Sequence, residues 1–425
     1  MSKQKFTVAI LGVGARGSLY GKLISAKKDA FRIVSLCDYN EQKLHLFGTE
    51  FGVVDTECYL DEKRFFEKKR ADVLVIATQD KDHIRHALKA FALGYDVLLE
   101  KPITDKIEDG EALIASQKKY GCKAVVCHVL RYAPAFLKAK ELLDNGEIGA
   151  LVAINALERV AYWHQAHSYV RGNWRKREES TPMIMAKCCH DLDLLQYYAK
   201  SKCESVSSVG DLHLFKKENK PQGATARCVD CPHKNTCAYS AVEIYIERWK
   251  KEGKPAGLWP HSVIALAPLT EEKLYEAIEN GPYGRCVYDC DNDVVDYQSV
   301  QATFENGVKA TLTMTAFTKD GGRRFHFYGT QGEIVLEEQN NCVRLERFDG
   351  RVETFNIDVL NESGYGHGGG DFYLIEKLYE VLCGDEKGEV TSLQASWESH
   401  LIALSAEESR LLGGRIVFPH KRSDL

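Results

Sequence analysis

Short apolar runs alternate with charged, amphipathic segments along the first 130 residues. The runs contain few polar residues, which is typical of strands buried on both faces of a parallel sheet. The segments between them carry apolar residues at helical spacing. This alternation predicts a doubly wound parallel α/β domain over residues 1–130. The expected strands are at 6–12, 31–38, 71–78, 95–101 and 123–129, and the expected helices are at 18–30, 40–52, 61–70, 82–94 and 106–121.

From residue 131 onward the pattern has a period of two, which is typical of strands with one exposed face. Turn pairs such as Asn306-Gly307 and Asp349-Gly350 separate alternating stretches, so we expect hairpins and a mostly antiparallel sheet in an α+β domain over 131–425. An irregular insert at about 216–292 interrupts this sheet. The expected strands and hairpins are at 150–163, 299–318, 323–338 and 343–357, and the hairpin at 323–338 turns at Gln331-Gly332. The expected helices are at 134–146, 372–384 and 393–414.

Composition narrows the classes of protein that fit. A length of 425 residues suits two domains. The net charge of −5 gives no electrostatic reason to expect a nucleic-acid or anionic-membrane partner. No apolar run approaches the roughly 18 residues that a membrane span needs, and the first residues indicate a strand rather than a signal peptide. We therefore expect a cytoplasmic protein whose 14 cysteines form no disulfide framework.

A dinucleotide site is predicted at the first strand-to-helix turn. Gly12, Gly14 and Gly17 form a GxGxxG pattern there, which permits a tight turn and brings phosphates to the helix N-terminus. The second strand ends at Asp38, whose carboxylate would accept from a ribose 2′-OH and repel a 2′-phosphate. We predict NAD as the cofactor, while the nearby Arg16 leaves NADP open.

Several motifs together resemble the Gfo/Idh/MocA oxidoreductase family. They are KFTVAILGVGARG, ATQDKDHIRHALKA, LLEKPIT, HVLRYAPAF and CHDLDLL, which are spread over most of the chain. The resemblance implies a Rossmann domain followed by an antiparallel α/β substrate domain, with the nicotinamide between them. It also implies that the loops after the fourth and fifth strands line the cofactor. The predicted cofactor residues are Gly12, Gly14, Ala15, Arg16, Gly17, Asp38, Thr78, His83, Glu100 and Lys101.

Lys101 and His190 are the candidate catalytic residues. A lysine at a strand's carboxyl end can hydrogen-bond a substrate hydroxyl and stabilise a developing alkoxide. A histidine suits proton removal from a secondary alcohol as hydride leaves. In the family the histidine is preceded by Asp-x-Gly-x, but here Ala186 and Cys188 stand at those two positions. Either His190 acts without that carboxylate or another residue replaces it.

Substrate contacts are predicted mainly in a polar, aromatic loop at 159–180. Aromatic faces suit a saccharide, and arginines suit an anionic substituent. His164 and His167 are also spaced so that a metal site is an alternative, as is a solvated loop. The predicted substrate-binding residues are His128, Arg131, Tyr162, His164, His167, Arg171, Trp174, Lys187, Asp193 and His367.

Three cysteines lie within ten residues in the irregular insert, at Cys228, Cys231 and Cys237. This knuckle predicts a structural zinc site, with His233 nearby and with Cys286 or Cys290 as the closing ligand. A free or disulfide-linked knuckle and an iron–sulfur site are the alternatives. Ordinary members of the family, as far as the resemblance goes, lack this knuckle, so it suggests a subgroup.

The leading hypothesis is an NAD-dependent oxidoreductase acting on a ring hydroxyl of a sugar, cyclitol or glycoside. One alternative is an NAD-dependent glycosidase that oxidises, eliminates and re-reduces its substrate, because the chain offers extra histidines for these steps. A second alternative is a non-catalytic NAD- or sugar-sensing regulator. Family likeness further predicts a homodimer or homotetramer.

Overall fold

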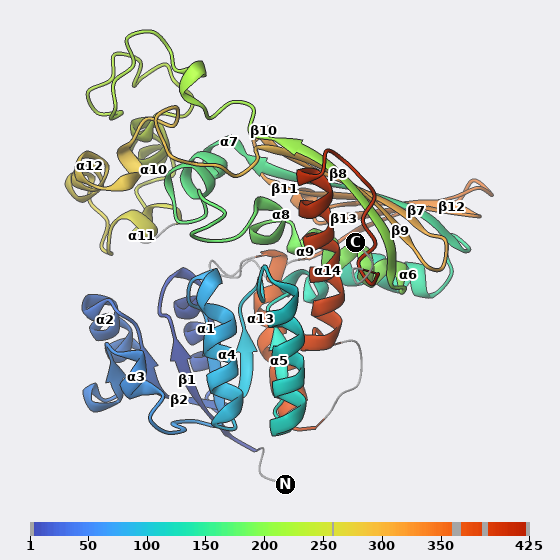
Figure 1. Cartoon of the computed structure of the whole chain (residues 1–425), viewed down its shortest axis with the longest axis horizontal. Coiled ribbons are helices and arrows are strands. Elements are labelled where there is room, and N and C mark those ends of the chain that lie inside the picture. The colour runs from blue at the N-terminus through green and yellow to red at the C-terminus, as the bar shows by residue number, and fades with distance from the viewer. Residues whose placement is uncertain (1–3, 257–258, 359–366, 385–389, 422–425) are drawn as a thin grey trace.

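Six parallel strands form the N-terminal sheet of this computed structural model, which describes residues 4–256, 259–358, 367–384 and 390–421 (Figure 1). Their order is β3-β2-β1-β4-β5-β6, the doubly wound arrangement that the alternating pattern predicts. The short β3 was not among the expected strands, because two residues carry too little pattern to be recognised. The strands are β1 (Phe6–Leu11), β2 (Phe31–Cys37), β3 (Cys58–Tyr59), β4 (Val73–Ile76), β5 (Asp96–Leu99) and β6 (Ala124–Val126).

Both faces of this sheet are buried. Val8 and Ile10 of β1 belong to one hydrophobic cluster, while the intervening Ala9 and Leu11 belong to another. The first face packs against α1 and α2, and the second against α4 and α5, which also pack on each other. The helices are α1 (Ala15–Ala26), α2 (Glu41–Phe51), α3 (Glu62–Phe65), α4 (His83–Ala92) and α5 (Ile107–Tyr120), with the 3₁₀ turns η1 (Asp55–Glu57) and η2 (Asp80–Asp82).

An eight-stranded sheet dominates the second half, in the order β14-β13-β12-β11-β7-β10-β9-β8. Its described pairs are antiparallel except β7 with β10, so a mostly antiparallel sheet is confirmed. The strands are β7 (Leu151–Ala161), β8 (Cys203–Asp211), β9 (Tyr297–Phe304), β10 (Lys309–Thr318), β11 (Gly322–Gly329), β12 (Gly332–Glu337), β13 (Cys342–Arg347) and β14 (Val352–Asn356), with η8 (Glu338–Asn340) between β12 and β13.

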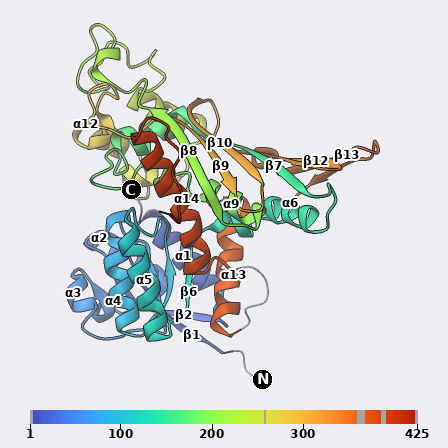
Figure 2. The same cartoon turned by 45° about the vertical axis from the view of Figure 1, so that its right-hand side comes forward.

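The helices of the second half pack on one face of the large sheet and on the N-terminal domain. In sequence order they are η3 (Val129–Tyr132), α6 (Pro134–Asp144), α8 (Met183–Ala186), α9 (Cys189–Ala199), η9 (His367–Gly369), α13 (Gly370–Leu382) and α14 (Leu393–Leu411). Figure 2 shows α14 running from the large sheet toward the N-terminal domain, where it packs against α5 and β6. α13 packs against α1 and η3. The two C-terminal helices therefore join the two domains. No described helix combines the length and apolar character needed to traverse a bilayer.

The segment after β7 differs from the expected loop. Residues 162–171 form a helical turn, α7 (Tyr162–His164), followed by a π-helix, η4 (Gln165–Arg171), and all seven residues of η4 are buried. Its polar side chains find partners inside the protein: His167 Nδ1 lies 2.8 Å from the hydroxyl of Tyr245, for example. The polar composition predicted a loop that lines the substrate, with a solvated loop as an alternative, but partners distant in the sequence bury these side chains.

The insert forms a lobe with its own hydrophobic cluster, which includes Tyr245, Trp249 and Leu274. The sequence pattern missed it because its apolar residues are spread over short, separate helices. These are η5 (Lys217–Asn219), η6 (Glu243–Glu247), α10 (Arg248–Lys251), α11 (His261–Ile264), α12 (Glu271–Asn280) and η7 (Pro282–Gly284).

Candidate functional site

The glycine-rich turn lies between β1 and α1, close to the end of β4. Gly12 has φ +88°, and a Cβ there would lie 2.5 Å from the carbonyl oxygen of Ala77. A Cβ on Gly17 would lie 1.8 Å from the carbonyl oxygen of Gly12. Gly14 caps α1 without a side-chain hydrogen bond and Ala15 begins the helix, so no cap side chain covers this N-terminus. The turn therefore fits the pyrophosphate of a dinucleotide.

Asp38 lies at the end of β2 and is tied to the same turn. Its Oδ2 accepts a hydrogen bond from the backbone N–H of Val13 at 2.8 Å, and its Oδ1 accepts one from Asn40 N at 2.9 Å. The carboxylate is thereby oriented beside the glycine turn, where a ribose would lie. These residues fit the adenosine half of NAD.

Arg16 is committed to two buried carboxylates. Its Nε donates to Glu100 Oε1 at 2.7 Å, and its Nη2 pairs with Asp371 of α13. Tyr20 OH also donates to Glu100, at 2.7 Å. Although burial raises the pKa of Asp371, the Arg16 guanidinium and then His367 hold it well below its usual range. An arginine neutralised in this way has little charge left for a 2′-phosphate, which favours NAD over NADP.

The other predicted cofactor residues, Thr78 and His83, contact protein groups. His83 is buried, with Nδ1 2.7 Å from the carbonyl oxygen of Pro102 and Nε2 3.2 Å from that of Thr78. Thr78 Oγ1 lies 3.0 Å from His86 Nδ1. In this arrangement His83 links the loop after β4 to the loop after β5.

Lys101 follows β5 and reaches the second domain. Its Nζ donates to the carbonyl oxygen of Ala186 at 3.0 Å, while Glu100 Oε2 accepts from the Lys101 backbone N–H at 3.0 Å. Within the described ranges the Lys101 ammonium forms no ion pair with a carboxylate. Ala186 stands where the family pattern has an aspartate, so a backbone oxygen takes the place of a carboxylate as the lysine's partner.

His190 lies one helical turn further along, in the first turn of α9. It is 4% exposed, and its ring centroid is 5.8 Å from that of His128 and 5.6 Å from that of His367. Burial, followed by the nearby Lys101 ammonium, holds the pKa of His190 well below its ordinary value. His190 Nδ1 has no hydrogen-bond partner among the described residues. The imidazole is therefore neutral near pH 7 and able to accept a proton.

Two predicted residues, Arg131 and Asp193, form a buried ion pair beside His190. Arg131 Nε and Nη2 donate to the two oxygens of Asp193 at 2.6 and 2.7 Å. His128 Nδ1 lies 3.9 Å from Asp193 Oδ2, and burial lowers the pKa of His128 to about 4. Asp193 therefore neutralises Arg131, and His128 remains a neutral ring.

A second buried ion cluster includes Asp191, the residue that follows His190, and the sequence patterns did not reveal it. Lys187 Nζ pairs with Glu158 of β7 at 3.2 Å, and Arg323 of β11 joins Glu158 to Asp191 at 2.9 and 2.8 Å. Burial raises the pKa of Asp191. Glu158 occupies an inward position of the alternating strand β7, and this is the one sequence signal that could have identified it.

The predicted substrate-binding residues at 162–174 lie in two separate parts of the structure. Burial, followed by the Lys187 ammonium, lowers the pKa of His164, and its ring lies 4.8 Å from that of Trp259 of the insert between centroids. Trp174 Nε1 donates to Asp80 at 3.0 Å. In contrast, Tyr162, His167 and Arg171 contact Tyr239, Tyr245 and Cys228 of the insert. The structure thus brings together the rings of His128, His190 and His367, and, in addition to burial, the Lys101 ammonium lowers the pKa of His128, His164 and His190.

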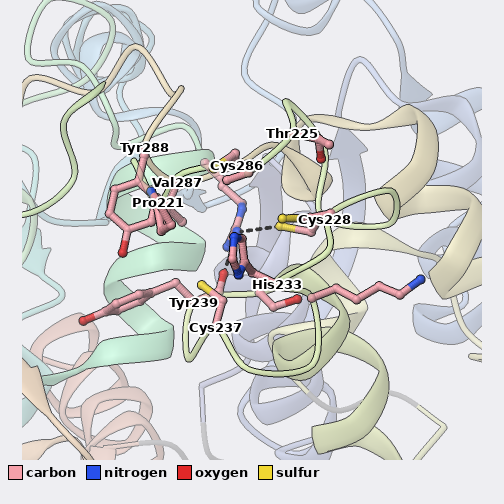
Figure 3. Close-up of a pocket in the computed structure, with 14 residues that line it drawn as sticks. Pro221, Thr225, Cys228, His233, Cys237, Tyr239, Cys286, Val287 and Tyr288 are labelled. Carbon is pink, nitrogen blue, oxygen red and sulfur yellow. Dashed lines mark hydrogen bonds between the residues drawn. The ribbon is translucent and has the colours of Figure 1, made fainter. Parts of the chain in front are cut away.

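Four cysteines of the insert, Cys228, Cys231, Cys237 and Cys286, line one pocket (Figure 3). All 14 cysteines lie within the described ranges, and none is disulfide-bonded. Across those ranges, no group of three or more His, Cys, Asp or Glu side chains is arranged to hold a metal ion. The geometry therefore does not support the predicted mononuclear zinc site.

Two family models match this chain. The first describes an oxidoreductase family with an NAD-binding Rossmann fold, GFO_IDH_MocA, and covers residues 6–128; the second describes the C-terminal α/β domain of the same family and covers residues 140–360.

Among curated proteins, YteT of Bacillus subtilis is 24% identical over 383 residues, covering 84% of this chain and 86% of its own length. The scyllo-inositol 2-dehydrogenase (NAD(+)) of Bacillus subtilis is 24% identical over 202 residues, covering 48% of this chain and 56% of its own. The 2,7-anhydro-N-acetylneuraminate hydratase of Mediterraneibacter gnavus is 23% identical over 202 residues, covering 48% of this chain and 51% of its own.

Solved structures share the fold over almost the whole chain. An oxidoreductase domain protein from Kribbella flavida has a TM-score of 0.72 at 14% identity and covers 98% of this chain and 100% of its own. A levoglucosan dehydrogenase in complex with NADH and levoglucosan has a TM-score of 0.71 at 16% identity, with coverages of 98% and 100%.

Proposed function

Because this chain belongs to the Gfo/Idh/MocA oxidoreductase family, we propose that it is an NAD-dependent enzyme that oxidises a ring hydroxyl of a sugar, cyclitol or glycoside. The observation that carries the proposal is the meeting of Lys101 and His190. Lys101 follows β5, the strand that pairs with β4 in the N-terminal domain. Its ammonium lowers the pKa of His190, which belongs to the second domain. Ligands of open α/β sheets bind at the carboxyl ends of the strands, where this pair lies.

In the proposed reaction the substrate alcohol lies between the two residues. Lys101 donates a hydrogen bond to the hydroxyl oxygen and stabilises negative charge that develops on it. The neutral His190 accepts the hydroxyl proton. NAD, when bound, supplies a nicotinamide that accepts hydride from the carbinol carbon, leaving a ketone. Lys101 acts without an aspartate at position 186, since the Ala186 carbonyl orients the lysine.

Aromatic rings support a carbohydrate as the substrate class. His164 packs against Trp259, and Trp163 lies 5.3 Å from Trp259 between centroids. Trp259 is 37% exposed, so part of its face is available to a ring C–H surface. Two of the similar proteins named above are, by name, an inositol dehydrogenase and a levoglucosan dehydrogenase.

A redox-assisted glycosidase is the second candidate, favoured by the four imidazoles of His128, His164, His190 and His367 near Lys101. Oxidation at one carbon acidifies the neighbouring C–H, a base removes that proton, and the aglycone leaves with a proton from an acid. Water then adds and hydride returns to the ketone. One imidazole serves the first proton transfer, and others are available for the later ones.

One assay separates these activities: NADH absorbance and aglycone release are followed together, with NAD and a panel of cyclitols, free sugars and aryl glycosides. Net NADH on cyclitols or sugars supports the dehydrogenase. Aglycone release that requires NAD without net NADH supports the glycosidase. Binding of NAD and sugar without any turnover contradicts both and indicates a regulator.

We further propose a cytoplasmic homodimer or homotetramer that pairs through the face of the large sheet remote from α6, α9 and α14. That face carries a stacked His326–Tyr328 pair with ring centroids 4.0 Å apart, and Asn155 Nδ2 donates to the Tyr328 hydroxyl at 3.3 Å. Multi-angle light scattering tests the oligomer: a mass of two or four chains is expected, and a monomer contradicts it.

A further inference from the structure

The insert contains a buried arginine that lacks an acidic partner. Arg171, at the end of η4, is 1% exposed. Its Nε donates to the carbonyl oxygen of Arg285 at 2.7 Å and its Nη2 to that of Tyr239 at 2.7 Å. Nη2 also lies 3.5 Å from Cys228 Sγ, whereas the buried Nη1 has no partner among the described residues. A buried cation of this kind requires a nearby negative charge.

Carboxylates do not supply that charge. The acidic side chains nearest in the sequence to the Arg171 partner Arg285 are engaged elsewhere, because Asp289 pairs with Lys220, and Asp291 pairs with Arg175 and Arg285. Within the described ranges Arg171 forms no ion pair with an acidic residue. The other groups around Arg171 that can carry a negative charge are cysteine side chains.

The cysteines around Arg171 converge on one pocket from two segments of the insert. Arg171, Cys228, Cys231, Cys237 and Cys286 all line it, together with apolar residues such as Pro221 and polar ones such as His233. Figure 3 shows Cys228, Cys237 and Cys286 around its centre. Backbone hydrogen bonds fix the two segments side by side: Cys228 N donates to Gly284 O at 2.9 Å, and Cys286 N donates to Ala226 O at 2.8 Å. Four thiols and a buried cation are therefore presented to the same small volume.

We propose that this pocket binds an iron–sulfur cluster through the thiolates of Cys228, Cys231, Cys237 and Cys286, with Arg171 neutralising part of its negative charge. A single zinc ion needs its ligand atoms within about 2.3 Å of one point, and no three described side chains are arranged in that way. A cluster is larger than a single ion, so its four thiolate ligands lie further apart around a shared cavity. N–H groups directed at the sulfurs, such as Arg171 Nη2, are typical of such sites.

The cluster's expected role is to anchor the insert to η4. Arg171 ends the π-helix, and four residues earlier His167 stacks on Tyr283 of the insert with centroids 4.8 Å apart. Loss of the centre would loosen the lobe that carries Trp259, which contacts His164. The cluster takes no part in hydride transfer, so its presence and the proposed oxidoreductase activity are independently testable.

The test is metal and sulfide analysis of the full-length protein, expressed with added iron and purified without oxygen. We expect about four iron atoms and four acid-labile sulfides per chain, visible charge-transfer absorbance that dithionite bleaches, and little zinc. Stoichiometric zinc without sulfide overturns the cluster. Failure to bind iron and sulfide both as purified and after anaerobic reconstitution also overturns it.

Variants locate the site. Cys231→Ser and Cys237→Ser should each lose most of the iron, and Arg171→Gln should lower iron retention although all the thiols remain. Cys290→Ser is the matched control, because Cys290 lies in the insert but outside the pocket lining and hydrogen-bonds the Cys286 carbonyl oxygen at 3.3 Å. Equal iron loss in this control contradicts the ligand set.

If circular dichroism shows that a ligand variant fails to fold, chelation of the folded wild-type protein replaces that variant. Loss of the cluster absorbance followed by its recovery with iron and sulfide supports the cluster. Unchanged absorbance overturns it.

Discussion

The ammonium of Lys101 donates a hydrogen bond to the carbonyl oxygen of Ala186, with the two atoms 3.0 Å apart. This contact joins the N-terminal domain to the helical turn that precedes His190. A carbonyl dipole orients a lysine without adding a full negative charge, so the local field at His190 stays positive. Burial, followed by that field, explains why the pKa of His190 is depressed.

Replacing Lys101 with alanine should lower kcat/KM by about 10²- to 10⁴-fold, the range for loss of a positioned acid–base or oxyanion-stabilising group. The lysine would contact the reacting oxygen in the transition state, so kcat should fall with it. Steady-state kinetics on the best substrate of the panel measure the effect. Lys118→Ala is the matched control, since Lys118 is exposed on α5. A folded Lys101→Ala variant with wild-type turnover would contradict the proposed mechanism.

Restoring a carboxylate at position 186 should change the pH profile. In Ala186→Asp the new negative charge near Lys101 stabilises the protonated imidazole, so the pKa of His190 should rise. The acidic limb of kcat/KM should then move to higher pH than in the wild-type enzyme. Ala186→Asn has nearly the same shape without the charge and should leave the limb in place. Identical limbs in the two variants would show that position 186 does not act on the catalytic base.

The parts of the fold and site that could be predicted are those that local sequence encodes. The placement of Gly12, Gly17 and Asp38 could be predicted from one strand-to-helix turn and one strand end, because a parallel sheet brings the ends of its strands together. Arg171 and His167 could not be placed in this way. Their surroundings come from Tyr239, Tyr245 and Arg285, more than 60 residues away in the sequence. These residues bury a segment whose polar composition predicted a substrate-lining loop.

The depressed pKa of His190 predicts activity that persists into acid. A general base must be neutral, and a pKa held below the ordinary 6.5 keeps His190 neutral as the pH falls from 8 to 6.5. In the direction of alcohol oxidation, kcat/KM should therefore stay level over that range and decline only below it. Circular dichroism over the same range separates this decline from unfolding. A limb centred at or above pH 6.5 would contradict His190 as a base in this environment.

The Arg16–Asp371 pair should make stability depend on pH. Asp371 is fully buried, and breaking a buried pair by removing one charge costs about 3 kcal/mol, so Asp371→Asn should lower the free energy of unfolding by about that amount at pH 7. Since Arg16 and His367 depress the folded-state pKa of Asp371, the pair's contribution is fully present above the unfolded-state value of about 3.9. It is then lost as the pH falls toward the folded-state pKa.

Urea titrations at pH 7, 5 and 3.5 would measure this difference. We expect the same gap between wild type and Asp371→Asn at pH 7 and 5, and a smaller gap at pH 3.5. Asp349→Asn provides the control, because Asp349 pairs with Arg351 on the surface, where solvent screens the interaction, and its removal should change little at any pH. A gap that is unchanged at pH 3.5 would mean that the asparagine acts through packing rather than through the lost charge. In that case Arg16 would have to be neutralised by Glu100 alone, and a Glu100→Gln variant should then show the pH-dependent gap that Asp371→Asn lacks.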